Sequence, residues 1–204
     1  VVSVELPSLE ELDRFPGQTT EQLHSKIERM SLPIQPERIA PKGQSDSSKP
    51  STQEMYHRLL EGPFKFCQEH LHSKVERCFS TVYDISPEKL GTDGFDLIFV
   101  GDVLLHTFSP WLALASIASV CKKGGVLILS QGMPDDLGPG PAMKYVGGVD
   151  PEGDDISWWW PNQACFEDML KKMGFHSVEV SGHSQGILRT TGFEFNRTIL
   201  HARK

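Results

Sequence analysis

Several polar side chains follow apolar segments of the sequence, where the carboxyl ends of strands are expected. Gly101, Asp102 and His106 come after the apolar run 95–100, and Glu5 ends a short run near the start of the chain. Open α/β sheets bind ligands beyond the carboxyl ends of their strands. There, a carboxylate can accept hydrogen bonds from both hydroxyls of a ribose, and a histidine can remove a proton from a bound group. The pattern therefore indicates a ligand site at one end of a sheet.

The elements that position these residues form one unit. The run Phe95–Val100 is almost continuously apolar, which is typical of a strand buried on both faces. Pro110 begins a helix with apolar residues at roughly helical spacing, and the Lys-Lys-Gly-Gly segment 122–125 is suited to its C-terminus. A second buried strand is predicted over 126–129. Together they predict a parallel βαβ unit with a right-handed crossover.

The order of residues in this middle segment also forms a recognisable set of motifs. Its first strand ends in Gly-Asp, followed by Val-Leu-Leu-His, a helix start Ser-Pro-Trp-Leu-Ala-Leu, and Lys-Lys-Gly-Gly-Val-Leu-Ile-Leu. It resembles the middle of a class I S-adenosylmethionine-dependent methyltransferase, nearest the branch with the tRNA wobble-uridine methyl- and carboxymethyl-transferases. The resemblance implies an α/β, Rossmann-like, mostly parallel sheet with a C-terminal antiparallel strand pair. It also implies S-adenosyl-L-methionine as cofactor and an enzyme. The scattered cysteines, interpreted as reduced and mostly buried thiols, indicate a cytoplasmic protein.

The resemblance implies roles for individual residues as well. Glu5 would bind the cofactor ribose, Asp84 the adenine amino group and Ile85 the adenine ring, while Gly101-Asp102-Val103 would border the cofactor pocket. His106 would be the catalytic residue that removes a proton from the methyl acceptor.

The residues alone leave other roles open. Glu5 is equally well explained as an exposed loop carboxylate, and Asp84 as a cap of the turn Ser86–Leu90. His106 could be a structural histidine that hydrogen-bonds its own loop, and Asp102 is better suited to shaping a pocket than to acid-base chemistry.

One part of the family pattern is not found in the sequence. The first strand and its Gly-x-Gly loop, which cradles the methionine part of the cofactor, should precede Glu5. The clusters Gly124-Gly125, Gly138-Pro-Gly140 and Gly147-Gly148 do not match it, because none leads from a strand into a helix. That strand is central in the family, so its absence would leave an unpaired gap in the sheet. We therefore expect residues 1–204 to form a single, N-terminally truncated methyltransferase-like domain; a degenerate relative with a rearranged sheet is the alternative.

The N-terminal part predicts further elements. A short strand precedes Pro7, and a helix is expected over Thr20–Met30 with Thr20 as a possible cap. Residues 31–52, rich in Pro, Ser, Lys, Gln and Gly, are expected to form a flexible insertion. Gln53–Leu71 predicts a helix interrupted at Gly62-Pro63, and Val75–Ile85 predicts a strand.

The C-terminal part contains a long segment rich in Gly, Pro and Asp. Residues 131–160 predict a loop over the site. Trp158, Trp160 and Asn162 lie at its end and are candidates for substrate binding, since a planar aromatic side chain can stack on a nucleobase. Core packing is an equal alternative for the tryptophans. A helix over Pro161–Gly174 and an antiparallel pair of strands, 175–180 and 193–202, complete the prediction.

Composition restricts the function. The net charge of −7 and the lack of a long basic run do not favour an extended nucleic-acid surface, and no apolar run is long enough to span a membrane. The four cysteines are scattered and the histidines lack metal-ligand spacing, so no metal is expected. The leading hypothesis is methyl transfer to a small molecule or an RNA base. The alternatives are a non-catalytic methyltransferase-like scaffold or subunit, and another nucleotide-binding Rossmann enzyme, which the final antiparallel pair disfavours.

Overall fold

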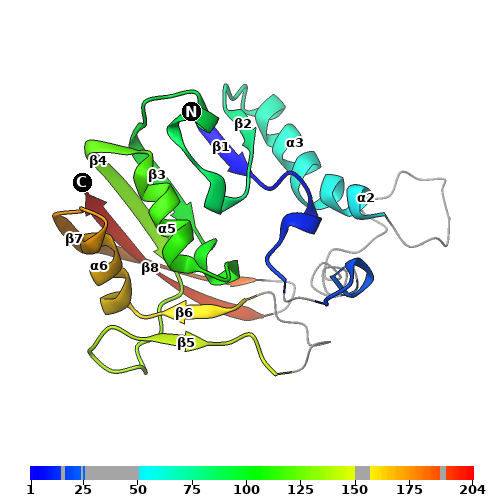
Figure 1. The fold of residues 1–204 in the computed structure, drawn as a ribbon. Coiled ribbons are helices and arrows are strands. Elements are labelled where there is room, and N and C mark those ends of the chain that lie inside the picture. Colours follow the sequence, from blue (N-terminus) through cyan, green and yellow to red (C-terminus); the bar gives the residue numbers. More distant parts are fainter. Residues whose placement is uncertain (15–16, 24, 26–50, 150–156, 189–191) are drawn as a thin grey trace. The chain divides into compact units, whose positions relative to one another are not determined.

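The computed structural model describes residues 1–14, 17–23, 25, 51–149, 157–188 and 192–204 (Figure 1). These residues form two compact units, one up to Thr81 and one from Val82 onward. Each unit is described by itself below, and the single-domain organisation stays a prediction.

The first unit pairs two short parallel strands with a helical segment. Strand β1 (Val2–Glu5) lies beside β2 (Glu76–Phe79), with Val2 opposite Glu76. A 3-10 turn, η1 (Leu9–Glu11), follows β1. The unit's core is a cluster of buried side chains that joins η1 to the helices: Leu9, Leu23, Met55 and Tyr56. The predicted strand over 75–85 is shorter than expected, because the chain turns into a 3-10 segment, η4 (Val82–Asp84), soon after β2.

The helix of the first unit is continuous where an interruption was predicted. It consists of α2 (Thr52–Tyr56), a π-helical turn η3 (His57–Glu61) and α3 (Gly62–His70). The interruption predicted at Gly62-Pro63 is wrong, because the wider π turn lets Gly62 N–H bond to the carbonyl of His57, five residues back. Pro63, which lacks an N–H, therefore stands in the first turn of α3, a position that tolerates proline.

The predicted helix after residue 19 is described only in part. Residues 20–23 are helical, and the cap is Thr19 rather than Thr20: Gln22 N–H donates to Thr19 Oγ1 at 3.2 Å, and Thr19 N–H donates to Gln22 Oε1 at 2.8 Å. This reciprocal pair is a capping box. The rest of that helix and the predicted insertion at 31–52, apart from its last two residues, lie outside the described residues.

The second unit is built on a four-stranded mixed sheet. Its order is β3 (Phe95–Gly101), β4 (Cys121–Gln131), β8 (Phe193–Arg203) and β7 (Ser177–Leu188) (Figure 1). Strands β3 and β4 are parallel, whereas β8 is antiparallel to both β4 and β7. The predicted α/β, Rossmann-like sheet with a C-terminal antiparallel pair is therefore confirmed.

Two helices cover one face of this sheet, α5 (Pro110–Ser119) and α6 (Gln163–Lys172) (Figure 1). Register places Leu129 opposite Leu200 on that face, and both are fully buried. Helix α5 ends earlier than predicted. Residues 122–125 belong to the start of β4, so their expected role in ending the helix is wrong.

The opposite face of β3 is open, so the prediction that this strand is buried on both sides is wrong. Leu97 and Phe99 are 61% and 68% exposed, whereas Val100, on the helix-covered face, is 5% exposed. One edge of β3 pairs with β4; within the described residues, no strand pairs with its other edge. The apolar composition of the segment predicted the strand correctly, but it could not show which strands and helices cover its two faces.

The segment 131–160 contains two strands where a loop was predicted. Strands β5 (Met143–Tyr145) and β6 (Trp159–Pro161) pair antiparallel, with Lys144 opposite Trp160. The tryptophan run therefore forms part of a small sheet that leads directly into α6.

The described residues lack three features: a membrane-spanning helix, a cluster of metal ligands and a disulfide. None of the helices they form is both long and apolar enough to cross a membrane. They contain no group of three or more His, Cys, Asp or Glu side chains that could hold a metal ion. All four cysteines are described, and no disulfide joins them.

Candidate functional site

The turn after β3 has an unusual backbone and a charged contact. Asp102 adopts a positive φ of 48°, a left-handed conformation that Asp and Asn tolerate better than most residues. Its N–H donates to Ser130 O of β4 at 2.9 Å, which fixes the turn to the carboxyl end of the neighbouring strand. Its Oδ2 accepts a 2.6 Å hydrogen bond from Nε of Arg197 on β8. Three strands therefore meet at the predicted position of the ligand.

The other carboxylate oxygen of Asp102, Oδ1, differs from Oδ2 in its hydrogen bonding. Asp102 Oδ1 is buried and has no hydrogen-bond partner among the described residues. A buried acceptor of this kind is costly unless a donor reaches it. Asp102 is therefore held by Arg197 through one oxygen, while its other oxygen is enclosed without a donor among the described residues.

The chain continues into a 3-10 turn that ends at the predicted catalytic histidine. In η5 (Leu104–His106), Leu104 is fully buried, and His106 N–H donates to Val103 O at 3.0 Å. His106 itself is half-buried, and Val103 is 40% exposed. The turn thus presents one apolar and one titratable side chain near the carboxyl end of β3.

The predicted adenine-binding pair lies in a turn that packs on α5. The Oγ–H of Ser116 donates to Tyr83 O at 2.7 Å, and Ser109 N–H donates to the Tyr83 hydroxyl at 3.3 Å. Next to Tyr83, Asp84 is exposed and Ile85 is 9% exposed. The alternative that Asp84 caps the following helix is wrong.

That helix has its own cap. Ser86 is the N-cap of α4 (Pro87–Leu90), and its Oγ accepts a hydrogen bond from Lys89 N–H at 3.2 Å. The predicted role of Asp84 toward adenine stays a prediction.

Glu5 belongs to the first unit and already has partners there. Its Oε1 accepts from Leu6 N–H at 3.0 Å, and its Oε2 lies 3.6 Å from Nη2 of Arg77. Glu5 does end strand β1, as predicted. Its role toward a ribose stays a prediction.

The three tryptophans have three different environments. Trp158 is 7% exposed and packs edge-on against Phe108, with ring centroids 4.6 Å apart. Trp159 Nε1–H donates to Phe108 O at 3.1 Å, whereas Trp160 is 42% exposed. Trp158 N–H donates to Leu105 O at 2.7 Å, so the tryptophan run is attached to the turn that ends at His106. Of the two predicted substrate-binding tryptophans, Trp160 is therefore the one accessible to a partner.

Asn162 has a clear structural role. It is the N-cap of α6, and its Oδ1 accepts from Cys165 N–H at 2.9 Å and from Ala142 N–H at 3.0 Å. Its Nδ2 donates to Gly140 O at 2.7 Å and to Gly138 O at 3.3 Å. Every polar atom of this amide is used within the protein, and its predicted contact with a substrate stays a prediction.

Two residues of this region were missed by sequence reasoning. Arg197 lies in the tripeptide Asn196-Arg197-Thr198, and its pairing with Asp102 joins positions 95 residues apart. Gln131 ends β4 and is 1% exposed, yet neither atom of its amide has a partner among the described residues. A glutamine that continues a buried apolar run was the only available signal.

The residues predicted to contact the adenosine half of the implied cofactor differ in exposure: Asp84 is exposed, Ile85 is buried and Val103 is exposed. Their contact with an adenosine stays a prediction. The methionine half needs a glycine-rich turn between a strand and a helix. The described residues contain no such turn.

Comparisons with known proteins gave similarity of structure alone. No family model matches the chain, and no curated protein matches it. Among solved structures, YcgJ from Bacillus subtilis is similar at 11% identity and a TM-score of 0.50, over 72% of this chain and 78% of that one. At this identity, the likeness shows the fold and nothing further.

Other similar structures include methyltransferases solved with S-adenosylhomocysteine. The N-terminal domain of EvdMO1, with S-adenosylhomocysteine bound, is 16% identical over 95% of this chain and 90% of that chain, at a TM-score of 0.47. Magnesium protoporphyrin IX methyltransferase from Synechocystis, also with S-adenosylhomocysteine, is 16% identical over 72% of this chain and 60% of its own, at a TM-score of 0.46. These weaker likenesses add no argument about the ligand of this chain.

Proposed function

We propose that this chain is part of an S-adenosylmethionine-dependent methyltransferase. The observation that supports this most is the sheet order, in which β8 lies between β4 and β7 and runs antiparallel to both. A final antiparallel pair beside parallel strands is what the resemblance implies for a methyltransferase, and it disfavours a dehydrogenase.

Our proposed arrangement of the site follows from the described turns. Asp84 and Ile85 would hold the adenine, and the turn Gly101–Val103 would border the rest of the adenosine. When bound, the cofactor supplies a methyl group already activated on a sulfonium centre. The protein then has to align the acceptor and exclude water. His106, half-buried after β3, would accept the acceptor's proton.

The open edge of β3 supports a second part of the proposal. A seven-residue apolar strand with an unpaired edge exposes a row of backbone donors and acceptors. We propose that a further strand, from sequence outside residues 1–204, pairs with this edge. By the resemblance, that strand would bring the glycine-rich turn for the methionine half of the cofactor.

Isothermal titration with S-adenosylhomocysteine tests both parts. We expect residues 1–204 alone to bind weakly or not at all, and a longer form that includes the additional strand to bind. In the longer form, Asp84→Asn should weaken binding about tenfold through the loss of a hydrogen bond to a charged group. Glu88→Gln removes a neighbouring exposed carboxylate and should leave binding unchanged.

Other results would contradict the proposal. Tight binding by residues 1–204 alone would show that no further strand is needed. Equal losses of affinity in the two variants would show that Asp84 makes no specific contact with the ligand.

A non-catalytic scaffold is the second candidate, and one observation favours it. Asp102 and Glu5, two of the predicted cofactor ligands, already have cationic partners within the protein, Arg197 and Arg77. If neither form of the protein binds S-adenosylhomocysteine, the scaffold is the better explanation. The methyl acceptor and the relation to the wobble-uridine enzymes stay predictions.

A further inference from the structure

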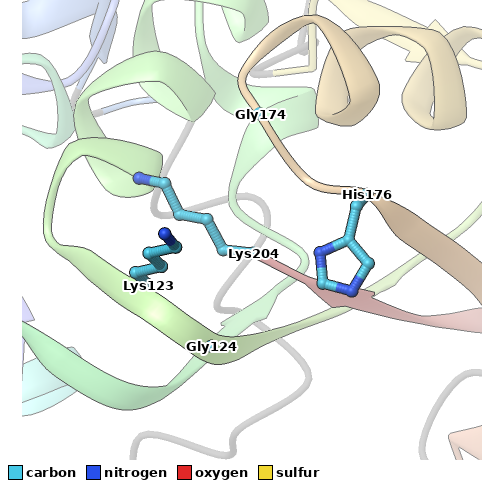
Figure 2. A pocket seen from close by; sticks show the side chains of 5 residues that line it. All are labelled: Lys123, Gly124, Gly174, His176 and Lys204. Carbon is cyan, nitrogen blue, oxygen red and sulfur yellow. The ribbon is translucent and has the colours of Figure 1, made fainter.

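An open pocket lies at the end of the second unit's sheet opposite the candidate site. Its volume is about 660 Å³, and it is lined by Lys123 and Gly124 of β4, Gly174 and His176 of the connection from α6 to β7, and Lys204 after β8 (Figure 2). From Gly124 to Gln131 strand β4 advances seven residues, or roughly 23 Å at about 3.3 Å per residue. The pocket is therefore separate from the turn that holds Asp102.

The pocket is basic although the protein is acidic. The chain has a net charge of −7, yet three of the five lining residues are basic and none is acidic. Within the described part of the chain, the side chains of Lys123 and His176 make no hydrogen bond or ion pair. Lys122, the next residue along β4, instead pairs with Asp93 at 3.0 Å. The side chains that line the pocket are thus more basic than acidic.

Lys204 is held in place by the surrounding main chain. Its Nζ donates to Ala118 O at 2.6 Å and lies 5.8 Å from the centre of the Phe175 ring. Its backbone N–H and C=O bond to Gly125 O at 2.9 Å and to Gly124 N–H at 2.6 Å. An ammonium has three donors. Lys204 therefore offers a fixed charge with donors to spare, and a preorganised cation loses little entropy when it binds an anion.

The two glycines of the pocket, Gly124 and Gly174, leave the main chain of its wall exposed. Gly124 and Gly174 have φ angles of +80° and +92°, which side chains rarely adopt, although an added Cβ would meet nothing within 4 Å at either position. The backbone conformation is what favours glycine here. One result is a wall of exposed main chain that a ligand can approach closely.

We propose that this pocket binds a small phosphate-bearing molecule. The two lysines act as point charges, and the lysines and the histidine as donors, toward tetrahedral oxyanions, whereas planar carboxylates are better matched by the fork of an arginine, and no arginine lines the pocket. A pocket of this volume admits a molecule larger than a single phosphate group. This site is independent of the methyltransferase proposal.

The test is a titration of pyrophosphate into the protein, followed by ¹H–¹⁵N NMR. The amides of Gly124 and Gly174 should shift and saturate, and higher salt should weaken binding. Lys123→Ala and His176→Ala should each weaken binding about tenfold, the expected loss for one charge-assisted hydrogen bond. Both side chains are exposed, so the variants should unfold at the same temperature as the original protein.

Lys172→Ala is the matched control, because it removes an exposed lysine near the pocket that does not line it. Its affinity for pyrophosphate should be unchanged. Three results would overturn the proposal: no saturable shift at the two glycines, an equal loss in Lys172→Ala, or citrate binding as tightly as pyrophosphate at equal ionic strength.

Discussion

The hydrogen bond between Arg197 and Asp102 offers a quantitative test of how the candidate site is held together. The Nε–Oδ2 distance is 2.6 Å, and the two side chains are 25% and 43% exposed. Fully exposed pairs contribute about 0.2–1 kcal/mol, and hydrogen bonds to charged groups about 1.5–3 kcal/mol. Because this pair is partly exposed, we expect a coupling free energy between these two ranges, about 1 to 1.5 kcal/mol.

A double-mutant cycle measures that coupling. Arg197→Met keeps the apolar stem of the side chain without its charge, and Asp102→Asn keeps both its size and its tolerance of the positive φ. The free energies of unfolding of the four proteins, from urea denaturation, give the coupling directly. Arg197→Met should be more destabilising than Asp102→Asn, because it leaves a carboxylate with one buried oxygen and no cation.

Two comparisons decide whether this reasoning holds. Arg203→Met changes another arginine of β8, which is exposed, and should alter stability by no more than about 0.5 kcal/mol. A coupling below about 0.3 kcal/mol would refute a structural role for the pair, since that is within the additivity of independent sites. The position of Asp102 would then be fixed by the backbone turn alone.

Three further predictions concern stability and reactivity. Asn162→Ala should destabilise the protein by roughly 2–3 kcal/mol in urea denaturation, because a cap and two donor bonds are lost, and Asn162→Asp, which keeps the accepting oxygen but places a buried carboxylate against the carbonyls of Gly138 and Gly140, should also be destabilising. Burial raises the pKa of the Cys165 thiol, so mass spectrometry after brief iodoacetamide treatment should find the exposed Cys67 alkylated first; the reverse order would contradict this. The hydrogen bond from Lys122 lowers the pKa of Asp93, so this contact stabilises the protein above the ordinary pKa of an aspartate and is lost as pH falls through the lowered value. The small difference in melting temperature between the original protein and Asp93→Asn should accordingly be present at pH 6 and vanish in strong acid.

Local sequence patterns predicted the elements better than their surroundings. The strand at Phe95 and the helix at Pro110 were correctly predicted, because apolar runs and N-terminal prolines act within a few residues. The burial of Phe99 was not, because it depends on which strands and helices cover that face. The prediction that the helix is interrupted at Gly62-Pro63 was wrong. A π turn has no characteristic composition, so the turn that accommodates Pro63 could not be predicted from the sequence.

The candidate site shows the same division. Asp102 was identified from its place after a strand, but its partner Arg197 is 95 residues away, and no local pattern connects the two. Asn162 was predicted to bind a substrate because it follows three tryptophans. Its capping bond, from Cys165 N–H, is local, but the rest of its amide is occupied by two carbonyls and an N–H that lie 20 to 24 residues earlier, contacts that exist only after folding.

The uncovered strand β3 has a consequence for handling the isolated chain. A strand with one unpaired edge, and with Leu97 and Phe99 exposed on one face, is a template on which another copy can add a strand, so association should grow with concentration and with time in storage. Net charge opposes this at neutral pH, but acidification toward the sequence pI of about 5.6 removes that repulsion. Dilute, slightly alkaline, low-salt solutions should therefore keep residues 1–204 dispersed, and a lysine in place of Phe99 should do the same at higher concentration.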